Sequence, residues 1–475
     1  MTPTLIHLLF LSTHALANAP SKLVVIDTLP TTLLPLYART DAEHRAAALL
    51  FEPLYYQSAI GSDLTSKLVR AYRLETAPEP ALELELEPTA LWADGHPIDG
   101  EDVCFTIAAW LLPTNPVPDS SAHRSRIASC TVGPDAKTAT VHFRRAVPDP
   151  RHWLQLALMP AHAFKDASIP PEHPFAHAAF GSKGRTAVLE DNRLNITSTA
   201  KRGPLQHIEV RADPLPNPTS PTVRVRSSRT PPLDNTPEGL QLRSYDSHDI
   251  WFVAVHYRGP LADPDVRRAL AATIDRPALI ETVWGKRYDS PAPITGPFLP
   301  SSPLHNRSVS TPPAPAGTLP QEPLKMGIRE ADAALEPRLA PALLAQLQAQ
   351  GLTVTLVEVP GDAAVSAPLP ATVNELDLML VRWTVPPTDH VGEVVAQEGR
   401  YNPFHTADTT ALRLFDTLDH ATTFTAERDA AHALHAHLQD GALALWLTTG
   451  VVRSEWPEVV PRVPLQPGWY WTELR

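Results

Sequence analysis

The sequence has little of what several classes of protein require. Two of its 475 residues are cysteine, Cys104 and Cys130, and neither has neighbours at the spacing of a metal-ligand set. Basic residues are outnumbered by acidic ones, 40 to 52, so the formal net charge is −12. This balance argues against a nucleic acid as partner, because phosphate binding needs a basic surface. Beyond the N-terminus no run of 18 apolar residues occurs, and we therefore expect no membrane span.

The short motifs of common hydrolases are also missing. The chain has no G-x-S-x-G, no H-E-x-x-H, and no S-x-x-K with its companion motifs. Residues 181–187 contain two glycines, but they lack the Lys-Ser/Thr ending and the preceding strand of a phosphate-binding loop. We therefore expect a protein that is not an enzyme and needs no cofactor. An exported hydrolase is the enzymatic alternative.

The composition that remains is that of a folded globular protein, with 43% hydrophobic and 19% charged residues. A chain of 475 residues is too long for one ordinary domain, so two or three hydrophobic cores are expected. Proline is abundant, at 52 residues, about twice its usual share. This abundance predicts many rigid loops.

The N-terminus has the features of an export signal. Leu5–Leu11 is a short apolar core, and Ala17-Asn18-Ala19 fits the small-residue rule for cleavage. We expect a signal peptide over residues 1–19, with cleavage after Ala17 as an alternative, and a periplasmic or otherwise extracytoplasmic protein. A short buried N-terminal helix is the alternative structure. In an oxidising compartment Cys104 and Cys130 can form a disulfide, although two separate thiols are an equally good expectation.

The most informative stretch is residues 91–110. Asp94-Gly95 predicts a tight turn, because glycine accepts positive φ without a Cβ clash. Asp99 is placed to cap a following helix, and acidic residues then fall in the first helical turn. The apolar face of that helix recurs at helical spacing, at Val103, Ile107 and Trp110. Local physics therefore predicts an extended segment, a turn and a helix.

The pattern W-x-D-G-x-P-x-x-x-E-D-V in this stretch resembles the family 5 extracellular solute-binding proteins, which are the oligopeptide, dipeptide and nickel receptors of ABC importers. A second match covers residues 262–276, where Asp263 caps a helix and Pro264 occupies its first position. Asp275 caps the next helix, which Gly285 ends. The resemblance is interrupted over residues 181–247, although Ile208–Arg211 fits an expected strand, and the Pro/Ser/Thr/Arg-rich part after Asp213 is expected to be a surface loop.

The resemblance implies an α/β fold with two lobes, of the periplasmic-binding-protein kind (type II, class C). Family members have an extra sub-domain in the first lobe and two crossover strands between the lobes. The implied division of this chain is a signal peptide at 1–19, lobe I at 20–55, 158–250 and 445–475, an inserted sub-domain at 56–157, and lobe II at 251–444.

The resemblance also implies a function. Such proteins close on a peptide or other small solute in the cleft between the lobes and present it to the ABC permease subunits in the membrane. We expect a monomer that binds a peptide or peptide-like small solute. The alternative is a degenerate, receptor-like protein used for sensing or surface binding without transport.

Four residues are candidate ligand contacts. In the family an Asp shortly after a strand Trp pairs with the peptide α-amine, for which a carboxylate in a dry cleft is suited. Trp383 matches that Trp, with plain core packing as its alternative, and Asp389 follows six positions later. His256 stands where many members have an Asn at the crossover strand, so binding and structural roles are equally open. Tyr37, in the first strand–helix segment that resembles the family, completes the set.

Histidines gather at His432, His435 and His437 on one expected helix. Spacing of three residues could bring two of them to one metal. We expect instead a solvated face opposite the apolar side of this helix, and no metal site.

Overall fold

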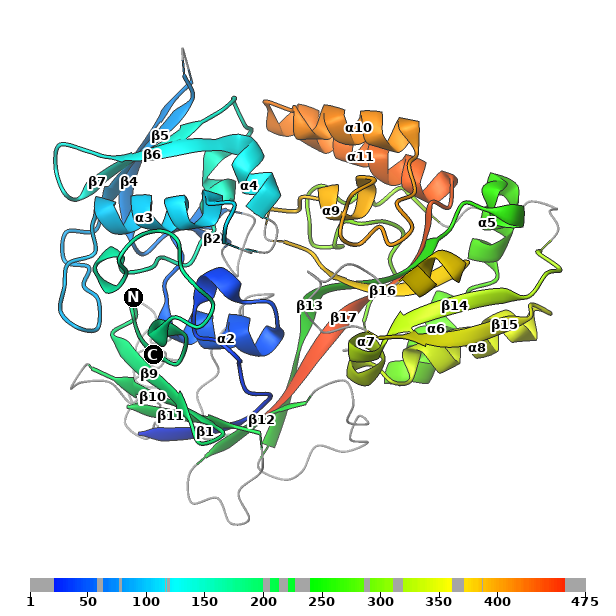
Figure 1. Cartoon of the computed structure of the whole chain (residues 1–475), viewed down its shortest axis with the longest axis horizontal. Helices are drawn as coiled ribbons and strands as arrows, with labels where there is room; N and C mark the ends of the chain where they lie inside the picture. Colours follow the sequence, from blue (N-terminus) through cyan, green and yellow to red (C-terminus); the bar gives the residue numbers. More distant parts are fainter. Residues whose placement is uncertain are drawn as a thin grey trace, which may run out of the picture.

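The computed structural model describes residues 21–57, 63–76, 79–115, 117, 120–199, 206–212, 221–226, 240–285, 291–310, 319–360, 371–386 and 388–457. The expected signal peptide lies outside the described residues. The chain forms two halves that lie side by side, with long strands crossing between them (Figure 1). We call the half built around residues 23–223 the first lobe and the half built around residues 250–447 the second lobe, because each range forms its own hydrophobic core.

One sheet of eleven strands, counted over the described residues, runs through both lobes in the order β15-β14-β16-β13-β17-β12-β1-β11-β10-β9-β8. In the first lobe β1 pairs in parallel with β11 and β12, whereas β8, β9 and β10 are antiparallel. The strands of this part are β1 (Lys22–Ile26), β8 (Ala178–Gly181), β9 (Arg185–Glu190), β10 (Arg193–Ser198), β11 (His207–Arg211) and β12 (Thr222–Arg226).

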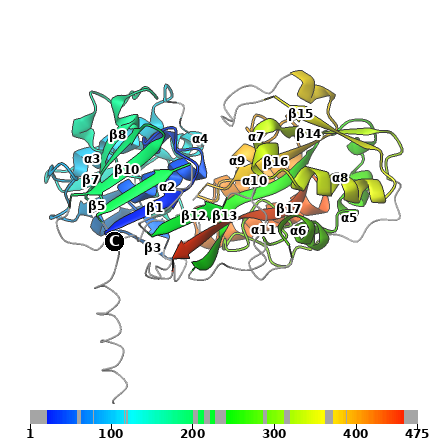
Figure 2. The ribbon, with the colours of Figure 1, turned by 90° about the horizontal axis from the view of Figure 1, so that it is seen from below.

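Two long strands join the lobes: β13 (Leu240–Val255) and β17 (Ala444–Pro457). They pair antiparallel from Leu240 opposite Pro457 to Ala254 opposite Ala444, with an irregularity between Asp246 and Ile250. Figure 2 shows both strands passing through the middle of the molecule, between the parallel strands of the two lobes. The backbone ladder of β13 and β17 is therefore the main link between the lobes.

A second sheet in the first lobe has the order β4-β5-β7-β6. Its strands are β4 (Val69–Glu75), β5 (Ala81–Leu86), β6 (Ile127–Val132) and β7 (Thr138–Phe143). The helices of this lobe are α2 (Asp41–Leu50), α3 (Gly100–Leu111) and α4 (Ser120–Arg126), and a small ladder joins β2 (Tyr56–Gln57) to β3 (Leu64–Thr65). Helix α3 begins with a capping box. The Asp99 carboxylate accepts the backbone N–H of Glu101 in the first helical turn, and the Asp102 carboxylate accepts the backbone N–H of Asp99. The disulfide Cys104–Cys130 ties α3 to β6.

The sheet of the second lobe is buried on both faces. Along β13, Trp251, Val253 and Val255 enter one core and Ile250, Phe252 and Ala254 the other, because successive side chains of a strand point to opposite faces. Two helices, α6 (Arg276–Trp284) and α8 (Leu339–Ala349), supply apolar residues to the first of these cores. Two others, α10 (Thr409–Asp419) and α11 (Phe424–Asp440), supply apolar residues to the second. This layering is typical of an α/β lobe with parallel strands.

Besides β13 and β17, the described residues of the second lobe form three strands and seven α-helices. The strands are β14 (Leu324–Arg329), β15 (Val354–Val359) and β16 (Leu378–Thr384). The helices are α5 (Pro264–Ala272), α6 (Arg276–Trp284), α7 (Glu330–Leu335), α8 (Leu339–Ala349), α9 (Gly392–Val395), α10 (Thr409–Asp419) and α11 (Phe424–Asp440).

Local signals in the sequence are confirmed where they are strong. Asp99, Asp263 and Asp275 are the N-caps of α3, α5 and α6, and Gly285 ends α6 with φ +81°. The α/β class is confirmed, while the domain boundaries stay a prediction.

The expected loop after Asp213 is wrong in part. The structure places β12 at Thr222–Arg226 and starts β13 at Leu240, so this region supplies two strands of the large sheet. The residues between these strands lie outside the described part of the chain. The proline-rich composition hid strands whose pairing partners, in β1 and β17, are distant in the sequence.

Reduction of the disulfide should destabilise the protein. Cys104 and Cys130 are 26 residues apart, and a cross-link over a loop of this length restricts the unfolded chain by about 3–4 kcal/mol. We expect urea unfolding with reductant to give a free energy of unfolding lower by about that amount. The variant with both Cys104→Ala and Cys130→Ala should show no effect of reductant. Two free thiols titrated in the native, air-oxidised protein would contradict the bond itself.

Candidate ligand-binding site

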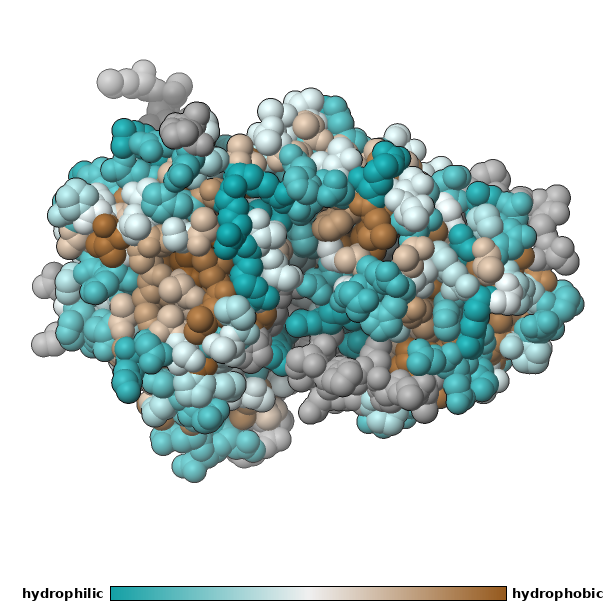
Figure 3. Space-filling model, turned by 45° about the horizontal axis from the view of Figure 1, so that its top comes forward, coloured by the Kyte–Doolittle hydropathy of each residue, from teal (hydrophilic) through white to brown (hydrophobic). Residues whose placement is uncertain are grey.

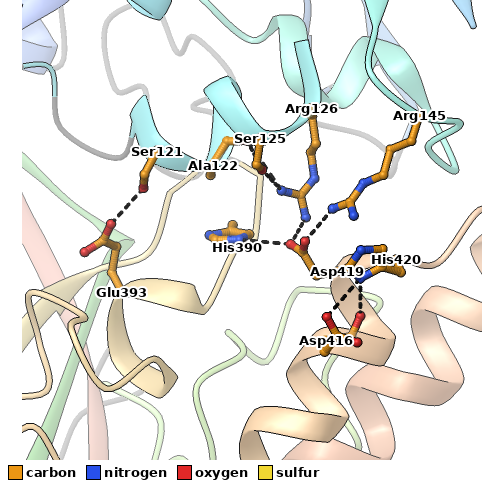
Figure 4. A network of polar contacts seen from close by, with 10 residues as sticks. All are labelled: Ser121, Ala122, Ser125, Arg126, Arg145, His390, Glu393, Asp416, Asp419 and His420. Atoms are coloured by element: carbon orange, nitrogen blue, oxygen red, sulfur yellow. Dashed lines mark hydrogen bonds and ion pairs between the residues drawn. The ribbon is translucent and has the colours of Figure 1, made fainter. Parts of the chain in front are cut away.

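The two lobes meet through a cluster of charged side chains around Asp419, at the end of α10. Arg126 and Arg145 of the first lobe both donate to this carboxylate, one to each oxygen. From the second lobe, His390 Nε2 lies 3.3 Å from Asp419 Oδ1 (Figure 4). Burial alone would raise the pKa of Asp419, but the hydrogen bond from His390 and the charge of Arg126 hold that pKa well below its usual range. Asp419 is therefore ionised and bridges the lobes.

Arg126 is fixed before it reaches across the junction. It is the last residue of α4, its guanidinium lies 4.0 Å over the Trp153 ring, and its Nη1 donates to Ser125 Oγ at 2.7 Å. The Trp153 ring in turn meets the His390 ring edge to face, with centroids 6.2 Å apart. A guanidinium that stacks on an indole and pairs with a carboxylate keeps its charge in a place with little water.

A second contact joins the lobes beside this cluster. Ser121 Oγ of α4 donates to Glu393 Oε1 of α9 at 3.0 Å, and the other oxygen of Glu393 accepts the backbone N–H of Arg400 at 3.1 Å. Figure 4 shows Ser121 and Arg126 projecting from the same helix toward two different segments of the second lobe. On the face drawn in Figure 3, hydrophilic residues border the junction between the halves. The junction is thus polar and built from both lobes.

Two further carboxyl groups, Asp389 and Glu427, lie near this junction, where imidazoles act on Asp389 and the charge of Arg126 acts on Glu427. Asp389 follows β16 with φ +52° and accepts from Ser302 Oγ at 2.8 Å. Burial raises its pKa, and the imidazoles of His152, from the first lobe, and His248, from β13, act on it in the opposite direction. Among the described residues, neither carboxyl group forms an ion pair with a lysine or arginine.

Glu427 lies in the first turn of α11. Burial and the negative charge of Asp389 raise the pKa of Glu427 to about 7, and the charge of Arg126 acts in the opposite direction. Two neighbouring carboxyl groups repel each other when both are ionised, so the charge of Asp389 favours the neutral form of Glu427. An incoming cation would relieve this repulsion and would find a site prepared for it.

Of the four residues proposed from the sequence, Asp389 is the one with a titratable neighbour from the other lobe, His152, and its ligand role stays a prediction. Trp383 is fully buried in the core of the second lobe and packs against Tyr401, with ring centroids 6.3 Å apart. Its indole Nε1 has no hydrogen-bond partner in the part of the chain that the structure describes. Its placement fits the core alternative, and a ligand role for it stays a prediction.

The other two candidates have neighbours within their own lobes. The His256 ring stacks on Phe404 with centroids 4.7 Å apart, and its Nδ1 lies 3.0 Å from the carbonyl oxygen of Leu376. Tyr37 is buried in the first lobe, where its hydroxyl donates to the carbonyl of Ile169 and burial raises its pKa to about 12. Their ligand roles also stay predictions.

Sequence reasoning missed Asp419, Arg126 and Glu427, because the partners of each are far away along the chain.

The expected solvated face of the histidine helix is wrong for His435, which is fully buried and bound to Thr295 Oγ1 and the backbone N–H of Asn306. A carboxylate and two imidazoles that could hold a metal, Asp94, His96 and His162, converge elsewhere, on the first lobe.

Comparison with known proteins gives the fold. No protein-family model and no curated protein matches the sequence, but solved structures do. The ABC transporter substrate-binding protein CtaP of Listeria monocytogenes matches with a TM-score of 0.76 and 13% identity, over 92% of this chain and 94% of that one. The oligopeptide-binding protein AppA of Bacillus subtilis, in complex with a nonapeptide, matches with a TM-score of 0.72 and 14% identity, over 93% and 95%. NikA of Brucella suis, in complex with Fe(III)-EDTA, matches with a TM-score of 0.75 and 15% identity, over 95% and 98%.

The fold is that of the family 5 solute-binding proteins. The resemblance drawn from the Trp92 and Asp263 motifs is confirmed, as is the two-lobed periplasmic-binding-protein class. Proteins of this kind that match are substrate-binding components of ABC transporters. Among the described residues, no helix is both long and apolar enough to cross a bilayer.

Substitution of the bridging carboxylate should open the lobes. Asp419→Asn leaves two guanidinium groups facing each other without their shared anion, and removal of one partner from a buried ion pair costs about 3–5 kcal/mol. Opening lets Arg126 and Arg145 regain water, so we expect the open form to be favoured and the radius of gyration in small-angle X-ray scattering to increase. Asp416→Asn, on the same helix but paired with the exposed His420, is the matched control. Unchanged scattering for Asp419→Asn would contradict a bridging role.

Glu427 should make stability depend on pH. Its pKa is raised from 4.5 to about 7 in the folded protein, so its contribution to stability is complete below pH 4.5 and is lost as the pH rises through 7. Between pH 5 and pH 8 the wild type should therefore lose on the order of 1–2 kcal/mol relative to Glu427→Gln, after allowance for partial exposure. Urea unfolding at several pH values measures this. The exposed Glu398→Gln should follow the wild type, and a pH-independent difference for Glu427→Gln would show that the group titrates normally.

Proposed function

We propose that this protein is an extracytoplasmic substrate-binding component of an ABC importer. It holds a peptide or peptide-like small solute between its lobes and delivers it to the permease subunits in the membrane. Solved structures of this fold include proteins bound to a nonapeptide, to the dipeptide Met-Leu and to metal chelates. The fold leaves the ligand open, so the choice among these classes rests on the chemistry of the junction.

The observation that carries the proposal is the pair of carboxyl groups, Asp389 and Glu427, near the lobe junction, neither of which forms an ion pair with a lysine or arginine among the described residues. A peptide with a free N-terminus brings an α-ammonium group, which would form a charge-assisted hydrogen bond with Asp389. Its charge would also stabilise the ionised form of Glu427. A ligand of this kind interacts with groups of both lobes and so favours the closed form.

The second candidate is a receptor-like protein that senses or binds at the surface without transport. The observation that favours it is that the residues proposed from the family pattern, Trp383, His256 and Tyr37, are engaged within single lobes in this structure. Under this proposal the lobes need not feed a permease.

Thermal unfolding against a ligand panel tests the proposal. We expect short peptides with a free N-terminus to raise the midpoint by mass action, equivalent to about 2.7 kcal/mol at one hundred times Kd. N-acetylated versions of the same peptides, and Asp389→Asn with the free peptides, should bind at least about tenfold more weakly, because a charge-assisted hydrogen bond is lost. The panel should include nickel–histidine and EDTA chelates, since related structures hold metal chelates.

Each outcome of the panel has a meaning. A shift with chelates alone would replace the peptide by a metal complex as cargo. No shift with any solute, in a protein that unfolds cooperatively, would contradict the proposal and favour the receptor-like alternative. If peptides raise the unfolding midpoint but cells that lack the protein take up peptides as before, the protein binds peptides and the transport part of the proposal is contradicted.

A further inference from the structure

Three potential metal ligands converge on the surface of the first lobe, in a cluster that the proposed function does not use. Asp94 Oδ2 lies 3.1 Å from His96 Nδ1 and 2.7 Å from His162 Nε2. One ligand atom from each residue lies within 4.8 Å of the other two. The imidazole rings are stacked, with centroids 4.1 Å apart. All three residues are exposed, so solvent reaches the cluster.

The backbone turn fixes Asp94 and His96 side by side. Gly95 has φ +94°, a left-handed conformation that glycine adopts without strain, and its N–H donates to the Trp92 carbonyl at 3.0 Å. The Trp92 N–H donates to the His96 carbonyl at 2.8 Å, and an isolated bridge pairs Leu91 with Pro97. Asp94 Oδ1 accepts the His96 N–H at 3.1 Å, which leaves Oδ2 for the two imidazoles.

A buried carboxylate holds the third ligand against this turn. Asp102 Oδ2 accepts from Trp92 Nε1 at 3.0 Å, and Asp102 Oδ1 accepts from the backbone N–H of Ala161 at 2.7 Å. Ala161 begins the short 3-10 turn that carries His162, and the His162 ring also stacks on Phe180 at 5.5 Å. The segments that carry the three ligands are therefore tied together by one side chain from α3. These hydrogen bonds hold the backbone of the segments that carry the ligands, while the His96 side chain itself is exposed.

The donor set fits a divalent cation of the zinc type. Zn²⁺ takes imidazole nitrogen and carboxylate oxygen at about 2.0–2.2 Å in a tetrahedron, which places ligand atoms roughly 3.3 Å apart. The distances from Asp94 Oδ2 to the two nitrogens, 2.7 and 3.1 Å, are close to this edge. Two nitrogens and one carboxylate are softer than the all-oxygen sets of Mg²⁺ and Ca²⁺. Exposure leaves a fourth position for water.

We propose that Asp94, His96 and His162 form a surface site for Zn²⁺ or a divalent ion of similar preference. The site belongs to the first lobe and has no part in the lobe contacts around Asp419, so it stands or falls independently of the solute-binding proposal. Because its ligands belong to the loop after β5 and the turn that begins at Ala161, a bound ion would cross-link these two segments directly.

Calorimetric titration of the tag-free protein with ZnCl₂ tests the site. We expect uptake of one ion per chain and a higher midpoint of thermal unfolding with zinc. His162→Asn and His96→Asn should each weaken binding at least about tenfold, by analogy with the losses that follow disruption of metal shells. His420→Asn is the matched control, because His420 is an exposed histidine that lies 3.2 Å from one carboxylate, Asp416, without a second imidazole.

Co²⁺ gives a second readout, since its visible absorption reports nitrogen ligands whatever the stability of the variant. Loss of that absorption in His96→Asn, whose side chain is 60% exposed and is not needed for the core, would support the site even if His162→Asn folds poorly. Failure of the wild type to take up one zinc ion would overturn the proposal. Equal binding by wild type, His96→Asn and His162→Asn, or an equal loss in His420→Asn, would overturn it as well.

Discussion

The pairing of β13 with β17 is the constraint on which the rest of the structure depends. It places both lobes on one sheet, so any movement between the lobes must bend or twist this ladder. In the second lobe both faces of β13 are packed, which makes that part rigid. The ladder is interrupted between Asp246 and Ile250 and again between Trp251 and Phe252. His248, which acts electrostatically on Asp389, lies in the first of these irregular parts.

The carboxylates of the junction divide into two kinds. Asp419 is saturated by two guanidinium groups and an imidazole, so its charge holds the lobes together and has little left for a ligand. Asp389 and Glu427 form no ion pair with a lysine or arginine among the described residues, and the negative charge of Asp389 raises the pKa of Glu427. Under the proposed function, the first kind would influence how far the lobes close, and the second would contact the ligand.

The sequence predicted those parts of the fold that local interactions decide. Asp99 and Asp263 cap helices because each accepts a backbone N–H within three residues, and this can be read from neighbouring letters. The strand at Thr222–Arg226 and the burial of His435 could not be read this way, because their partners belong to distant segments. The same holds for the sites. Asp94 and His96 are two positions apart, but the third ligand is 68 positions from Asp94, and only the folded first lobe brings it there.

The most recognisable motif of the chain is a folding device, and this explains why the fold was easier to predict than the ligand. Its Trp92 and Asp102 form one unit, in which the buried carboxylate accepts from the indole, from the N–H of Asp99 and from the N–H of Ala161. Each of these hydrogen bonds satisfies a donor inside the first lobe, either at the start of α3 or on a neighbouring segment. The motif therefore specifies packing within the first lobe and carries no information about the junction between the lobes. The groups that would choose a ligand come from α11, from the segment after β16 and from the first lobe. No short pattern spans these segments, and the chemistry of the junction therefore has to be read from the folded chain.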